Sequence, residues 1–119
     1  MVQKESRLSV ADNCGVWTVG IFHIYRGFRH KIGYVNDFVK VSLKKTRPDN
    51  WLKKGKKSRA FIVRTAFRSL RKDGSFIKLF TNDCILLKKR MTPRGREVLG
   101  PITYGIRKKK VLASFIGII

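Results

Sequence analysis

Hydrophobic residues along this chain fall into short runs that turn-forming residues interrupt, and this pattern predicts a fold made mainly of β-strands. The segment 37–44, DFVKVSLK, alternates most clearly. Val39, Val41 and Leu43 share one face of the predicted strand, and the lysines and the serine between them share the other. We therefore expect a strand whose inner face is apolar and whose outer face is basic.

Two continuous apolar runs flank a turn-rich stretch further along the chain. The runs at 60–63 (AFIV) and 84–87 (CILL) are too short for a stable helix, and their composition favours strands, the first of them buried on both faces. Asp73-Gly74 is a turn dipeptide, because glycine reaches positive φ without a steric clash. The chain is predicted to return there as a strand over 75–80 and to bend again at Asn82-Asp83.

The N-terminal part is predicted to form a hairpin. Residues 8–11 are typical of a strand, the cluster 12–15 (DNCG) of a turn, and 16–25 of a longer strand with apolar residues on both faces. Gly20 within the longer strand indicates a bend or a bulge. One face of that strand is expected to carry Trp17, Val19, Ile21, His23 and Tyr25.

Basic residues are concentrated in the segments between the predicted strands. Residues 44–59 hold many lysines and arginines against the single acid Asp49, and Pro48 and Gly55 break any helix, so we expect an exposed loop. The loop 26–31 combines cations with Phe28, which suits phosphate contact, and a solvated turn explains it equally well. Base stacking by Phe28 is less favoured, because it also needs an unpaired base within reach. A flexible basic connection is predicted over 88–96.

The C-terminal segment has a different pattern. Thr103 can cap a short helix that runs through Ile106 and Lys110. Cations at 107–110 would then suit the helix macrodipole as well as a polyanion. Residues 111–119 are expected to pack back on the domain or to meet a partner.

Length and charge narrow the class of protein. A chain of 119 residues with 43% hydrophobic content is the size of one domain with one core. Its 28 Lys and Arg against 7 Asp and Glu give a net charge of +21, which a polyanion would best neutralise, and nucleic acid is the leading candidate. A membrane surface is not expected, because the cations do not line one face of a long helix and no apolar run approaches ~18 residues.

Groups for catalysis or metal binding are not evident in the sequence. Five of the seven acids lie beside an Asn or a Gly, where side-chain hydrogen bonds build turns. Cys14, Cys84, His23 and His30 lack the paired spacing of a zinc site, so the cysteines are expected to be reduced thiols in the core. We therefore expect no enzyme activity, no cofactor and no metal.

Several of these residues together resemble the family of the universal large-subunit ribosomal protein number fourteen. The matching signature is a small residue, three apolar positions, Asp-Gly, Asn and an aliphatic pair, here Ala60, 61–63, Asp73-Gly74, Asn82 and Ile85-Leu86. Residues 8–15, Arg64-Thr65 and 100–103 also look like the family. The sequence departs from it at Phe61, Leu79, Ile85 and Glu97, of which the first three are apolar exchanges that a core can accommodate.

The resemblance implies a small closed five-stranded β-barrel with basic loops and short C-terminal helices. It implies a single domain over 1–119, with a helical appendage over about 103–119. The expected function is that of a structural constituent of the large ribosomal subunit, which binds folded rRNA at the subunit interface. Expected partners are large-subunit rRNA, small-subunit rRNA across intersubunit bridges, a neighbouring ribosomal protein paired at a sheet edge, and a ribosome silencing factor. A free single-stranded nucleic-acid-binding barrel is the alternative, which predicts aromatic residues across one open sheet face. The aromatic residues are instead expected to point mostly inward.

Cations on loops are the predicted rRNA contacts, because Lys and Arg displace counterions from phosphates. They are Arg26, Arg29, Lys31, Lys44, Lys45, Arg47, Lys53, Lys54, Lys56, Lys57, Arg64, Arg68, Arg71, Lys72, Lys88, Lys89, Arg94, Arg96, Arg107 and Lys108. The charge is high for the family, the use of Lys, Ile and Phe suggests an AT-rich gene, and signature positions have drifted. We therefore expect a mitochondrial location, with a plastid or the bacterial cytoplasm as alternatives.

Overall fold

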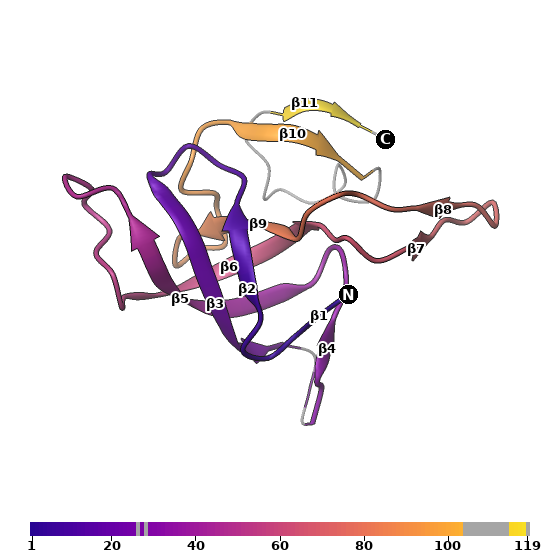
Figure 1. Cartoon of the computed structure of the whole chain (residues 1–119), viewed down its shortest axis with the longest axis horizontal. Coiled ribbons are helices and arrows are strands. Elements are labelled where there is room, and N and C mark those ends of the chain that lie inside the picture. The colour runs from indigo at the N-terminus through magenta and orange to yellow at the C-terminus, as the bar shows by residue number, and fades with distance from the viewer. Residues whose placement is uncertain (26, 28, 104–114, 119) are drawn as a thin grey trace.

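Five strands close into a barrel that surrounds the larger hydrophobic core (Figure 1). The computed structural model describes residues 1–25, 27 and 29–103, together with the backbone of 115–118. The barrel closes where the first and last of its strands run parallel, with Ser9 opposite Asp83. The predicted closed barrel is therefore confirmed. Its strands, in order round the wall, are β2 (Arg7–Val10), β3 (Val16–Ile24), β5 (Phe38–Thr46), β6 (Lys57–Arg64) and β9 (Asp83–Leu87).

Three two-stranded sheets extend the barrel. They pair β1 (Val2–Gln3) with β4 (Ile32–Gly33), β7 (Ser69–Leu70) with β8 (Phe76–Ile77), and β10 (Val98–Ile102) with β11 (Phe115–Ile118). The first two pairs are antiparallel and the third is parallel. In Figure 1 the β7–β8 hairpin and the loop between β5 and β6 project at opposite ends of the long axis.

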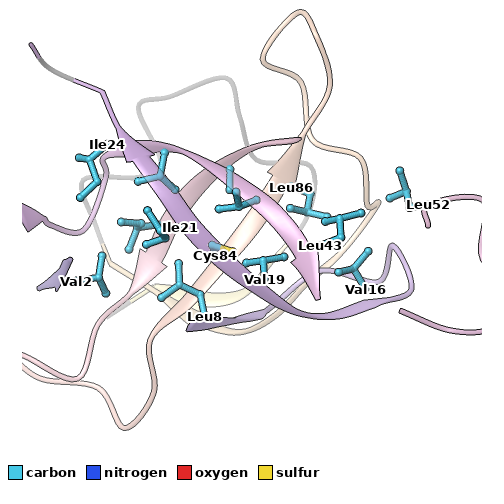
Figure 2. Packing of buried hydrophobic residues seen from close by; sticks show 14 residues of the cluster. Val2, Leu8, Val16, Val19, Ile21, Ile24, Leu43, Leu52, Cys84 and Leu86 are labelled. Atoms are coloured by element: carbon cyan, nitrogen blue, oxygen red, sulfur yellow. The ribbon is translucent and has the colours of Figure 1, made fainter. Parts of the chain in front are cut away.

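The apolar runs of β6 and β9 are buried on both faces because each face has its own core. Inside the barrel, Ile62 and Leu86 pack with residues of the other strands, and Figure 2 shows Leu86 and Cys84 among them. The neighbouring side chains on the outer face belong to a second cluster that Val98 and Ile102 of β10 complete. Strand β10 therefore covers the outer face of β6 and β9. The members of the second cluster from β6 and β9 are Phe61, Val63, Ile85 and Leu87.

The predicted alternation holds in β5 but not in β3. Val39, Val41 and Leu43 are buried, as expected. In β3, Val19 and Ile21 are buried while Trp17 is exposed, so the prediction that these three residues share a face is wrong. The pairing of β3 with β5 shifts register at three places along the strand, and such shifts interrupt the regular alternation of inward and outward side chains. These shifts lie on either side of Gly20, where the pairing with Ser42 is regular, so they are not at the residue that indicated a bend or a bulge.

Two predicted segments are shorter in the structure. The exposed basic loop covers 47–56 rather than 44–59, because β5 continues to Thr46 and β6 begins at Lys57. The outer face of a barrel strand accommodates lysines, so a run of cations does not by itself end a strand. The strand expected over 75–80 is only Phe76–Ile77, although the turn before it is confirmed, with Gly74 at a φ of 88°.

No helix occurs within the residues that the structure describes. The helix predicted to begin near Thr103 falls on 104–114, which lie outside the described residues. Residues Phe115–Ile118, which the expected helical appendage included, form strand β11 instead. They pair with β10, so this part of the C-terminal segment packs back on the domain.

Arg64 fastens β10 to the barrel. Its Nε donates to Asp83 Oδ2 at 2.6 Å, and its Nη1 donates to the carbonyl oxygens of Leu99 at 2.6 Å and Pro101 at 3.2 Å. Gly100 between them has a φ of +84°, and a Cβ there would lie 2.4 Å from Arg64 Nη1. Glycine is therefore required both by the backbone and by the guanidinium that crosses it.

Candidate nucleic-acid interface

The loop between β5 and β6 is a basic projection with a fixed base. Leu52 is buried and belongs to the barrel core, at one end of the cluster shown in Figure 2. Asn50 Nδ2 donates to the Cys14 carbonyl oxygen at 3.1 Å, and the Arg47 backbone N–H donates to the Gly15 carbonyl oxygen at 3.0 Å. The lysines of this loop are consequently presented from an anchored backbone, which reduces the entropy lost when they bind a partner.

Trp51 is an exposed residue in the middle of this loop that was not among the candidate contacts predicted from the sequence. Its side chain is 76% exposed although both of its neighbours, Asn50 and Leu52, are tied to the barrel. Lys56 Nζ lies 4.7 Å from the centroid of the indole ring. An exposed indole beside lysines suits stacking on a base. The signal was present in the sequence, since an aromatic residue within a basic loop had singled out Phe28, which lies outside the described residues.

The β7–β8 hairpin carries the second group of predicted cations. Arg68 lies over the Phe76 ring, with 5.1 Å from Cζ to the ring centroid. Asp73 accepts hydrogen bonds from the backbone N–H and the hydroxyl of Ser75, which fixes the turn, and these bonds lower the pKa of Asp73. The hairpin thus presents Arg71 and Lys72 at its tip, far from the β5–β6 loop (Figure 1).

The predicted rRNA contacts are mostly exposed but do not form one patch. Those exposed on the surface are Arg29, Lys31, Lys44, Lys45, Arg47, Lys53, Lys54, Lys56, Lys57, Arg68, Arg71, Lys72, Lys88, Lys89 and Arg96. Arg64 and Arg94 are half-buried, and Arg64 is used within the protein to hold β10. Arg26, Arg107 and Lys108 lie outside the described residues. The predicted contacts are spread over several strands, over loops and over the β7–β8 hairpin.

Exposed aromatic residues correct another expectation. The prediction that the aromatic side chains point mostly inward is wrong, because Phe61 is the one fully buried aromatic among the described residues. The exposed ones lie on β3, on separate loops and on the β7–β8 hairpin, and so they do not form one stacking face on the sheet. They are Trp17, Phe22, Tyr34, Trp51, Phe67, Phe76 and Phe80.

Acidic residues and thiols serve the fold. Asp12 Oδ2 accepts from the buried backbone N–H of Leu86 at 3.2 Å, and Asp37 Oδ2 accepts from that of Tyr34 at 2.8 Å. Both cysteines are free, as expected. Burial raises the pKa of Cys14 to about 12, with a further contribution from Asp12, and burial also raises the pKa of Cys84. Both thiols are therefore protonated at neutral pH, and little of the nucleophilic thiolate is formed.

Within the described part of the chain, no three His, Cys, Asp or Glu side chains are grouped to hold a metal ion. The described residues also include no helix with the length and apolar character that a membrane crossing requires.

Fold and charge together define a small basic β-barrel protein whose buried acids and thiols belong to its own fold. Comparison with known proteins gives the family. The model of the ribosomal protein L14p/L23e family matches residues 1–115. The large ribosomal subunit protein uL14m of Tetrahymena pyriformis is 48% identical over 118 residues, which cover 98% of each chain. The large ribosomal subunit protein uL14 of Mesomycoplasma hyopneumoniae (strain 7448) is 42% identical over 112 residues, which cover 94% of this chain and 92% of the relative.

The chain belongs to the ribosomal protein L14p/L23e family. It is a ribosomal protein of the large subunit and not an enzyme, and the resemblance found in its signature residues is confirmed over almost its whole length.

Proposed function

We propose that the protein binds and stabilises folded rRNA of the large ribosomal subunit at the subunit interface and contributes to intersubunit bridges. The observation that carries this proposal is the placement of the charge. There are 28 Lys and Arg against 7 Asp and Glu, and most predicted contacts are exposed while acids such as Asp12 and Asp83 are buried in the fold. Such a surface repels itself in isolation, and phosphates that replace bound counterions would neutralise it.

Protein partners would be met at the edges of the small sheets. A closed barrel has no free strand edge, so sheet-edge pairing with a neighbouring large-subunit protein has to use β1–β4, β7–β8 or β10–β11. Small-subunit rRNA would be reached by the projecting loops, of which the β5–β6 loop and the β7–β8 hairpin extend furthest from each other (Figure 1). A ribosome silencing factor remains a proposed partner on the basis of family membership alone.

A mitochondrial location is proposed for the assembled particle. The relative from Tetrahymena pyriformis, whose name marks a mitochondrial type, is 48% identical, against 42% for the bacterial relative. The high net charge also supports a mitochondrial location. Subcellular fractionation tests it, and the alternative outcomes are the bacterial cytoplasm and a plastid.

Replacement by Ala of Lys53, Lys54 and Lys56 in the β5–β6 loop, together with Lys57 at the start of β6, tests this basic segment. We expect a folded protein, because all four side chains are exposed and the change removes only the packing of Lys56 on Trp51 and of Lys57 on Phe22, each worth about 0.5–1 kcal/mol. Binding to a structured fragment of large-subunit rRNA should weaken. The slope of log affinity against log salt should fall by about 3–4, roughly one for each phosphate that the variant no longer neutralises.

The matched control removes the same charge elsewhere, with Lys4, Arg7, Lys78 and Arg90 changed to Ala, all of them exposed and none of them a predicted contact. A smaller decrease in salt slope and normal incorporation into subunits are expected for the control. Equal effects in the two variants would mean that the loop contributes only net charge.

A further inference from the structure

A hollow of about 160 Å³ lies on the outer surface of the barrel, over β5, β6 and β9. Lys40 of β5 is opposite Arg59 of β6 in the strand register, and Arg59 is opposite Leu87 of β9. These three residues, which all line the hollow, form a row across three neighbouring strands. The site therefore lies on the wall of the barrel, whereas the cations described above lie mainly on loops.

A tight turn after β9 forms the rim of the hollow. The Lys88 backbone N–H donates to the Thr92 carbonyl oxygen at 2.7 Å, and Met91 adopts a φ of 63°. The chain thereby returns beside β9, where the Arg94 backbone N–H donates to the Leu86 carbonyl oxygen at 2.9 Å. Arg59 Nη1 donates to the Lys89 carbonyl oxygen at 2.9 Å and holds this turn against β6.

The lining is strongly cationic and includes no carboxylate among the described residues. Like charges gathered in one hollow repel each other, and an anion placed among them removes that repulsion. Lys and Arg donors in such an arrangement form short, charge-assisted hydrogen bonds to phosphate oxygens. The cationic residues of the lining are Lys40, Lys57, Arg59, Lys88, Lys89 and Arg94.

Arg94 adds an observation that is independent of the charge count. Its Nε is buried and has no hydrogen-bond partner among the described residues. A buried donor without an acceptor is costly, and such groups are rare in folded proteins unless a ligand or water satisfies them. Arg94 lines the hollow, and a rotation of its guanidinium toward a bound anion would give this buried donor an acceptor.

We propose that this hollow binds a single phosphate group, and that in the assembled particle the group is a backbone phosphate of rRNA. A cavity of about 150 Å³ holds one molecule the size of benzene, so the hollow suits one phosphate rather than a whole nucleotide. The inference rests on the proposed rRNA binding and extends it from loops to a preformed site on the barrel wall. Lys40 and Arg59 become contacts that the sequence did not indicate.

The first test measures affinity for a structured rRNA fragment at fixed salt. The variant Lys40→Gln with Arg94→Gln removes two donors from the site, and the control Lys4→Gln with Lys78→Gln removes the same charge from exposed positions elsewhere. A charge-assisted hydrogen bond is worth about ten- to a hundredfold in affinity. We expect the site variant to bind at least about tenfold more weakly than the control, with thermal unfolding of both variants close to wild type.

The second test uses inorganic phosphate alone with the complete chain. At constant ionic strength, phosphate is expected to shift the NMR resonance of the Arg94 Nε–H group in the wild type and the control. In the variant Lys40→Gln, which keeps Arg94 in place, phosphate should shift the Arg94 Nε–H resonance far less. An unchanged Arg94 resonance in the wild type would overturn the site.

The two tests separate the site from the proposed function. If the wild type binds rRNA and the site and control variants lose affinity equally, the hollow is not an rRNA site and the inference fails while the proposed function stands. If phosphate shifts Arg94 but the rRNA affinity is unchanged in the site variant, the hollow takes free phosphate and the RNA part is wrong. If the wild type does not bind rRNA at all, the proposed function fails, and the RNA part of the inference fails with it.

Discussion

Raising monovalent salt from about 50 to about 200 mM is expected to weaken binding of the protein to a structured large-subunit rRNA fragment by a factor of about 10³–10⁵. That range applies to a protein that neutralises about 6–10 phosphates, and the exposed cations of the β5–β6 loop and the β7–β8 hairpin, together with Lys88 and Lys89, can supply this many contacts. The weakening arises because salt makes the release of counterions from the RNA less favourable. Filter binding or fluorescence anisotropy across a salt series measures the slope.

A plain single-stranded RNA of the same length is the control for this prediction. Proteins of the large subunit are expected to prefer the folded fragment, since RNA helices and junctions are recognised through shape and phosphate positions. Equal or tighter binding to the single strand would favour the free single-strand-binding alternative. A change of less than about tenfold over the salt range would contradict binding that depends mainly on phosphates.

Replacing Arg64 by Ala is expected to lower the free energy of unfolding by about 3–5 kcal/mol, the range for removing one partner of a buried ion pair. The Asp83 side chain is only 6% exposed and the Arg64 side chain 12%, so the Asp83 carboxylate would lose its counter-charge in a position with little access to water. The carbonyl oxygens of Leu99 and Pro101 would lose their donor as well. Urea denaturation of the variant and the wild type gives the difference.

Arg68→Ala is the matched control, because Arg68 is exposed on the adjoining segment and its removal changes the net charge equally. We expect it to change stability by no more than about 1 kcal/mol, because only the packing of its guanidinium on the Phe76 ring is removed. Amide hydrogen exchange adds a local readout, since release of β10 should accelerate exchange at Leu99 and Ile102 in the Arg64 variant. If the Arg64→Ala variant is as stable as the Arg68→Ala control, Arg64 does not hold β10 against the barrel.

The sequence predicts a barrel strand correctly where apolar and polar residues alternate regularly along it. Strand β5 alternates strictly, and its register with β3 and β6 places Val39, Val41 and Leu43 inside. The apolar run of β6 was predicted to be buried on both faces, which β10 explains by covering the outer one. Strand β3 could not be predicted in the same way, because its register shifts depend on pairing with β5 and leave no separate mark in its own sequence.

The candidate interface was predictable in composition but not in arrangement. Arg64 was grouped with the loop cations because its immediate neighbours do not reveal Asp83 and the β10 carbonyl oxygens that hold it. Lys40, Arg59 and Arg94 come from three separate parts of the chain, and only the strand register and the turn after β9 bring them to one hollow. Sequence patterns report local preference, whereas this site depends on contacts between distant segments.

Sedimentation of the particle tests the central claim most directly. The protein, tagged and expressed in its own cells, is followed through a sucrose gradient of the cell lysate at moderate salt, with rRNA measured in every fraction. The account predicts that the chain sediments with the large ribosomal subunit and its rRNA, and that nuclease treatment moves it to the top of the gradient. Recovery of the chain as a free protein, in fractions that lack ribosomal RNA, would contradict the account.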